Sequence, residues 1–227
     1  MKKEEIVSRI KNGMKEACFH AINFSLCAKD IIKAEYFYTV FIANYLLPQI
    51  EWGGSTRVNV EHPTEDFCCN AFPYQSGGTG RNMNFRRGVG QNGKHHTPER
   101  KGKIDITITE KDISLCAIEV KGFNPAKALV EKDLRRNLQY FNMIDTGTGE
   151  SLVEFAFFVS FHSYEWNSDP NSRTIKLQNR FDNYLKNLNT LKVTRTISES
   201  FLISHEESEP GQQHLFIGNI VVTERFS

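Results

Sequence analysis

Two short apolar segments in the middle of the chain each carry ionisable residues at positions that a strand would hold inside the fold. The first is Lys-Ile-Asp-Ile-Thr-Ile at 103–108, and the second is Cys-Ala-Ile-Glu-Val-Lys-Gly at 116–122. Their apolar residues predict strands in both segments. Folded cores seldom hold Asp, Glu or Lys at such places unless the charges are paired or bind a metal. The chain is therefore expected to gather Asp105, Glu119 and Lys121 into one polar site.

The size and composition of the chain are those of one globular domain. Its 227 residues suffice for a single well-buried core, and 39% hydrophobic with 24% charged residues is ordinary for folded proteins. The sequence has no run approaching the roughly 18 apolar residues of a membrane span. Its N-terminus lacks the apolar segment of a signal peptide. We therefore expect a single domain over 1–227, in a cytoplasmic protein without membrane contact.

The cysteines show no framework of disulfides or zinc ligands. There are five, an odd number, and no two are spaced as Cys-x-x-Cys: Cys18, Cys27, Cys68, Cys69 and Cys116. A disulfide-stapled secreted domain is not indicated. The pair His95-His96 has no zinc-like spacing to the adjacent Cys68 and Cys69. Free thiols are expected.

The chain is expected to begin with helices and to continue with strands and helices in alternation. Helices are indicated by apolar spacing and by end signals, and strands by alternation or by unbroken apolar runs. The expected elements are a helix with its apolar face at Ile6, Ile10, Met14 and Cys18, a helix at 31–47 with its N-cap at Asp30 and its stop at Pro48, strands at 57–60, 104–108 and 113–120, a helix at 126–141, a strand at 153–161, a helix at 174–191 and a strand at 214–223.

This order of elements predicts an α/β fold. The strands on either side of Lys111-Asp112 are expected to form a hairpin. The helix at 126–141 is a crossover, which makes the strand before it and the strand at 153–161 parallel. Helices can then cover both faces of a mixed sheet, giving a three-layer α/β/α domain. Its parts are a helical start (1–50), a core (about 31–161) and a C-terminal helix and strand (174–224).

A basic segment precedes the first of the two charged strands. The net charge of the whole chain is only +1. Between Gly77 and Lys103, however, seven cations face Glu99 alone: Arg81, Arg86, Arg87, Lys94, Arg100, Lys101 and Lys103. Residues 75–98 hold six glycines and almost no large apolar side chains, which predicts a long loop. A loop of this charge attracts phosphate backbones, although a solvated surface excursion would carry the same residues.

The charged residues of the two strands are expected to meet. Glu119 and Lys121 are two residues apart on a strand, so their side chains leave the same face with α-carbons about 6.6 Å apart. Asp105 lies in the neighbouring strand, with Ile104 and Ile106 expected on the opposite face. The hairpin can therefore bring Asp105 beside Glu119.

Two neighbouring carboxylates repel each other unless a cation or a proton lies between them. Mg²⁺ is the expected cation, with Mn²⁺ able to substitute, because Mg²⁺ binds carboxylates, carbonyls, waters and substrate phosphates. The expected ligands are Asp105, Glu119 and the carbonyl of Val120. Lys121 beside the metal could orient or help deprotonate a metal-bound water and offset charge in the transition state.

Asp105 followed by Glu119-Val120-Lys121, on a hairpin that leads into a helix, resembles the PD-(D/E)XK nuclease superfamily, the restriction-endonuclease-like fold. The resemblance covers about residues 31–161. It implies Mg²⁺-dependent cleavage of DNA, with Asp105 and Glu119 as metal ligands and Lys121 as the catalytic lysine. Family members often add a glutamate from a preceding helix, and Glu35 matches that position. The chain departs from the motif at Ile104, where the family name has Pro.

Several readings remain open beside a DNA endonuclease of restriction or phage defence. The chain could be an inactive member of the fold that binds nucleic acid or a protein, or an RNA-cleaving or toxin nuclease. Glu119 and Lys121 could also form a surface salt bridge, with Asp105 in a turn. Arg136, on the helix behind the site, could hold a DNA phosphate, brace Glu119, or pair with Asp133. A homodimer would match a duplex whose two strands are both cut.

Overall fold

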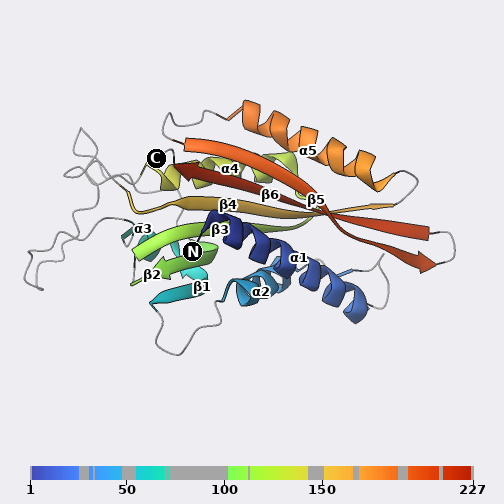
Figure 1. Ribbon diagram of the computed structural model, residues 1–227, viewed down its shortest axis with the longest axis horizontal. Coiled ribbons are helices and arrows are strands. Elements are labelled where there is room, and N and C mark those ends of the chain that lie inside the picture. The colour runs from blue at the N-terminus through green and yellow to red at the C-terminus, as the bar shows by residue number, and fades with distance from the viewer. Residues whose placement is uncertain are drawn as a thin grey trace, which may run out of the picture.

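The computed structural model describes residues 2–25, 31–32, 34–47, 55–69, 71, 102–111, 113–142, 151–165, 169–188, 194–209 and 212–225. Within these residues the chain forms five helices and six strands (Figure 1). In chain order they are α1 (Lys3–Ser25), α2 (Glu35–Leu46), β1 (Thr56–Pro63), α3 (Thr64–Cys69), β2 (Lys103–Glu110), β3 (Ile113–Phe123), α4 (Lys127–Tyr140), β4 (Phe155–Glu165), α5 (Pro170–Lys186), β5 (Thr194–Glu209) and β6 (Gln212–Arg225).

The six strands form one mixed sheet in the order β1-β2-β3-β4-β6-β5. β2 and β3 form the expected antiparallel hairpin, and β3 pairs with β4 in parallel. The remaining neighbours in the sheet are antiparallel. The crossover through α4 therefore has the predicted effect, because a parallel pair needs a connection that returns the chain to the same end of the sheet.

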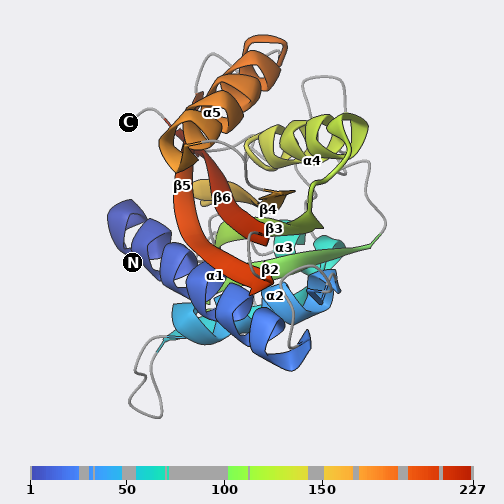
Figure 2. The same ribbon diagram turned by 90° about the vertical axis from the view of Figure 1, so that its right-hand side faces the viewer.

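Helices cover both faces of the sheet. α1 and α2 lie on one face and α4 and α5 on the other (Figure 2). The side chains of β4 alternate between the two layers: Phe157 and Val159 pack with α1 and α2, whereas Phe158 packs with α4 and α5. A strand buried on both faces explains the apolar run from Phe155 to Val159. The α/β class and the layered arrangement are as predicted.

The apolar face predicted for α1 is the face that the helix buries. Ile6, Ile10, Met14 and Cys18 are all at most 2% exposed. Gly13 lies on the same side and lets α2 approach closely, since a Cβ built there would be 2.8 Å from the Cα of Ile42. None of the described helices is long and apolar enough to cross a membrane.

Besides shifts in element bounds, such as α5 at Pro170–Lys186 where 174–191 was expected, three elements differ in their start or in their presence. α2 begins at Glu35 with Ala34 as its N-cap, whereas the expected N-cap, Asp30, lies outside the described residues. The short helix α3 was not expected. β5, with 16 residues, was missed because its Ser, Thr and Glu residues break any apolar alternation. It is held by pairing along its length with β6.

We expect Gly13→Ala to destabilise the protein. Helix propensity alone would favour alanine by about 1 kcal/mol, but the added methyl group would meet the backbone of α2. Overpacking of this kind costs about 1–3 kcal/mol, so the free energy of unfolding in urea should fall. The exposed neighbour Asn12 provides the control: Asn12→Ala has no clash and should leave stability unchanged or slightly higher.

Candidate functional site

Asp105 is anchored where the pairing of β2 and β3 ends. Their paired residues run from Glu110↔Ile113 to Ile106↔Ile118. One residue further, the Oδ2 atom of Asp105 accepts a hydrogen bond of 2.7 Å from the backbone N–H of Val120. Beyond the last residue pair of the two strands, a carboxylate oxygen thus accepts the backbone N–H. Asp105 is only 8% exposed, and its carboxyl group is fixed beside the Glu119–Val120 peptide.

The alternation expected around Asp105 does not hold. Ile106 packs in the cluster beneath α1 and α2, whereas Ile104 packs with Phe67 and Tyr140 in another cluster. The prediction that both isoleucines share one face was therefore wrong. In the neighbouring strand, Glu61 lies between the residues that pair with Ile104 and Ile106, and it has a φ of 55°. A left-handed residue interrupts the regular strand geometry on which alternation depends.

Glu119 is buried on the side of the sheet that α4 covers. It is 1% exposed, and the hydroxyl of Tyr140 in α4 donates a 3.4 Å hydrogen bond to its Oε1 atom. Its neighbours Ile118 and Val120 pack in the cluster beneath α1 and α2, as the sequence predicted. The alternative that Glu119 forms a surface salt bridge is wrong, because its side chain is buried.

The ammonium group of Lys121 lies between the two helical layers. Its Nζ donates to Oε1 of Glu35 at 2.8 Å and to the carbonyl oxygen of Val120 at 3.2 Å. Oδ2 of Asp133 lies 3.5 Å from the same nitrogen. Glu35 begins α2 and Asp133 belongs to α4, helices on opposite faces of the sheet (Figure 2). The lysine therefore joins both layers at the end of β3.

These contacts keep Lys121 positively charged. Burial by itself lowers the pKa of a lysine. The hydrogen bond to Glu35 and the charges of Asp133, Glu35 and Asp105 act in the opposite direction, and the pKa of Lys121 is raised from its usual 10.5. The site thus contains a cation at neutral pH, in contact with the carboxylates of Glu35 and Asp133 and under the influence of the charge of Asp105.

Asp133 is a member of the site that sequence reasoning did not find. Its side chain is 4% exposed, and its Oδ1 atom accepts a 2.7 Å bond from Nη1 of Arg136. Arg136 therefore pairs with Asp133, which was one of the three readings left open for it. The spacing of Asp133, Asn137 and Tyr140 was a usable signal, since residues at i, i+4 and i+7 share one helix face. All three are buried.

The oxygen atoms of the site are of the chemical types that bind a hard divalent cation. Carboxylates and a backbone carbonyl are the ligands that Mg²⁺ takes from proteins, and the carbonyl of Val120 already accepts from a cation, the Lys121 ammonium. Among the described residues, however, no three His, Cys, Asp or Glu side chains are grouped closely enough to hold a metal ion. Metal binding would require the Lys121 ammonium to leave the Val120 carbonyl and the carboxylates to move closer together.

Other predicted residues lie elsewhere. The basic residues expected to contact DNA fall outside the described residues: Arg81, Arg86, Arg87, Lys94, Arg100 and Lys101. Lys103, at the start of β2, is described and lies 3.6 Å from Glu61. Cys18 and Cys116 are buried, Cys68 is half-buried, and these three are thiols outside any disulfide, as predicted.

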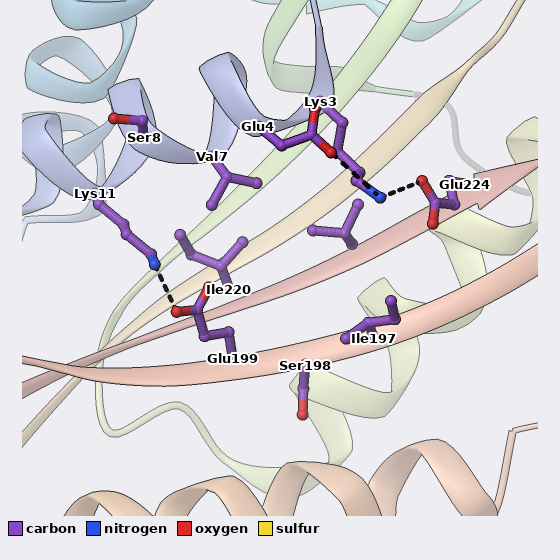
Figure 3. A pocket seen from close by; sticks show the side chains of 11 residues that line it. Lys3, Glu4, Val7, Ser8, Lys11, Ile197, Ser198, Glu199, Ile220 and Glu224 are labelled. Carbon is purple, nitrogen blue, oxygen red and sulfur yellow. Dashed lines mark hydrogen bonds and ion pairs between the residues drawn. The ribbon is translucent and has the colours of Figure 1, made fainter.

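A pocket of about 370 Å³ lies away from these residues, between α1 and strands β5 and β6 (Figure 3). Its walls include Val7, Ile197 and Ile220. Two ion pairs border it, Lys3–Glu224 at 2.8 Å and Lys11–Glu199 at 2.5 Å. Neither the acids around Lys121 nor Lys121 itself line this pocket.

Comparison with protein-family models, with curated proteins and with solved structures finds no match for this chain.

We expect Lys121→Met to destabilise the fold. Removing the ammonium leaves the buried carboxylate of Asp133 with Arg136 alone and removes the bond to Glu35. Breaking a buried ion pair is costly, and for this partly exposed pair we expect a loss of about 2 kcal/mol in urea unfolding at neutral pH. Lys132→Met, an exposed lysine of α4, is the control and should change stability by less than about 0.5 kcal/mol.

The stability of wild type and that of Lys121→Met should respond differently to high pH. Because the folded pKa of Lys121 lies above the unfolded value of 10.5, its stabilisation is fully present below pH 10.5 and is lost as pH rises through the folded pKa. The stability difference between wild type and Lys121→Met should therefore shrink above pH 10.5. A difference that stays constant through this range would contradict the role given to the charge.

Proposed function

We propose that this protein is a Mg²⁺-dependent nuclease that hydrolyses phosphodiester bonds of DNA, with a core of the restriction-endonuclease-like type. One observation carries the proposal: the ammonium of Lys121 donates to Glu35 at 2.8 Å and to the carbonyl of Val120 at 3.2 Å. Asp105 accepts a hydrogen bond from the backbone N–H of Val120, and Glu119 directly precedes Val120 in β3. The contact between Glu35 and Lys121, 86 positions apart in the chain, supports the set of residues that the resemblance implies.

Each residue of the set has a distinct part in the proposed chemistry. Asp105, Glu119 and the Val120 carbonyl would hold the metal ion, which supplies Lewis-acid activation of the phosphate and of a bound water. Lys121 offers its ammonium protons to oxygens of the scissile phosphate and offsets their growing charge. Glu35 orients Lys121 through the 2.8 Å bond. The basic segment at 81–101 would attract the DNA backbone, and a homodimer would present two such sites to a duplex.

One observation favours a second candidate. No group of three potential ligands is close enough to hold a metal ion in the described part of the chain, and the acids there already share the charge of Lys121. A nuclease-fold module that binds nucleic acid or a protein without cleaving would have this arrangement. The two candidates differ in whether carboxylate-dependent metal binding occurs.

Cleavage of plasmid and linear DNA tests the nuclease. We expect activity with Mg²⁺ or Mn²⁺ and none with EDTA. Asp105→Asn, Glu119→Gln and Lys121→Met should each lower kcat by about 100-fold or more, because groups aimed at transition-state charge contribute on that scale. The controls Lys132→Met and Glu131→Gln remove one positive and one negative charge from α4, away from the proposed site, and should retain activity. Full activity in both Glu119→Gln and Lys121→Met would reject the assignment of the site.

Metal affinity provides a readout that does not depend on cleavage. By titration calorimetry with Mn²⁺, Asp105→Asn and Glu119→Gln should abolish measurable binding. Lys121→Met should instead raise the affinity, roughly tenfold, because it removes a positive charge from the neighbourhood of the ion. Weaker binding by Lys121→Met would show that the lysine does not compete with the metal. Wild-type protein that binds no Mn²⁺ would favour the non-catalytic module.

A further inference from the structure

Asp133 is placed in α4 as the innermost of the acids that contact Lys121. Its side chain is 4% exposed, whereas that of Glu35 is 43% exposed. A carboxylate at such depth is unfavourable unless both its oxygens are engaged. Here each oxygen faces a different cation: Oδ2 lies 3.5 Å from Lys121 Nζ, and Oδ1 lies 2.7 Å from Arg136 Nη1. Arg136 therefore fixes the orientation in which Asp133 meets Lys121.

The ammonium of Lys121 has three N–H donors and three acceptors around it. They come from its own strand (the Val120 carbonyl), from α2 (Glu35) and from α4 (Asp133). A lysine side chain has a long flexible stem, so one contact alone would leave the nitrogen free to swing. Contacts from both helical layers restrict it from two sides. If the Val120 carbonyl turned to another cation, one N–H would become available to a phosphate oxygen.

We propose that Asp133 is a positioning residue, which holds the Lys121 ammonium at the reacting phosphate while Arg136 holds Asp133. The inference rests on the proposed nuclease function and adds a residue to it. In this role Asp133 acts through Lys121 and contacts neither the substrate nor the metal itself. Glu35, which is more exposed, shares the task, but Asp133 is the fixed support because its carboxylate is enclosed and is bonded by Arg136.

Steady-state cleavage of one defined duplex tests the positioning role. Asp133→Asn keeps the shape of the side chain and removes its charge. We expect kcat to fall about 10- to 100-fold, the scale of a small misplacement of a catalytic group, while KM for DNA changes less than about twofold because DNA does not contact Asp133. Asp133→Glu should recover part of kcat. Glu131→Gln, which removes a carboxylate near the same turn, should match wild type.

A double-mutant cycle tests the contact without relying on activity. The shift in urea midpoint caused by Asp133→Asn should be clearly smaller in the Lys121→Met background than in wild type, because contacting groups are not additive. Equal shifts would overturn the proposal even if the wild-type protein cleaves DNA. A rise in KM with kcat unchanged would overturn it as well.

The failures of the two proposals are distinguishable. If wild type binds no metal and cleaves no DNA, the nuclease and the positioning role fall together, and a positive cycle then marks an ion pair of structural value only. If wild type cleaves and Asp133→Asn matches it, only the positioning role falls. Should Asp133→Asn not fold, Asp133→Glu decides: wild-type kcat in that variant would overturn the proposal, and a reduced kcat with unchanged KM would support it.

Discussion

The bridging of two helical layers by one ammonium group sets the geometry of everything around it. Lys121 reaches Glu35 in α2 and Asp133 in α4 from the end of β3, so both helices must present these acids at the same end of the sheet. The apolar contacts of each layer fix the helices laterally, but they are not directional. Hydrogen bonds and ion pairs are directional. The polar contacts at the end of β3 therefore fix the site more narrowly than the core around them.

The local pattern of the sequence was sufficient for five of the six described strands and for part of the site. Ile106, Ile108 and Ile118 alternate with polar residues and are buried on one face, so the hairpin and the neighbourhood of Asp105 and Glu119 followed from spacing. Glu35 could not be placed in this way, because 86 residues separate it from Lys121. It came only from the resemblance to a nuclease family.

The failures of prediction have physical causes in particular residues. Asp133 was read only as a partner for Arg136 within one helix turn, and that pairing exists. Its second contact, to Lys121, depends on how α4 packs against β3, which no spacing within α4 reveals. Ile104 and Ile106 pack in different clusters at the point where Glu61, in the neighbouring strand, adopts a positive φ, and no spacing within 104–108 reveals that irregularity. β5 was missed because an edge strand needs few apolar residues when its neighbour β6 supplies the hydrogen bonds.

The cost of burying charge is the strongest physical reason to assign a function to this site. Replacing a buried ion pair by apolar residues of similar size is often neutral or stabilising, so stability alone gives little reason for a site of this kind. Four acids and two bases lie around the end of β3: Glu35, Asp105, Glu119, Asp133, Lys121 and Arg136. The acids outnumber the bases and carry the oxygens that a divalent cation prefers, but among the described residues no three of them are grouped closely enough to hold one. Metal binding is therefore the property that decides between an enzyme and a binding module.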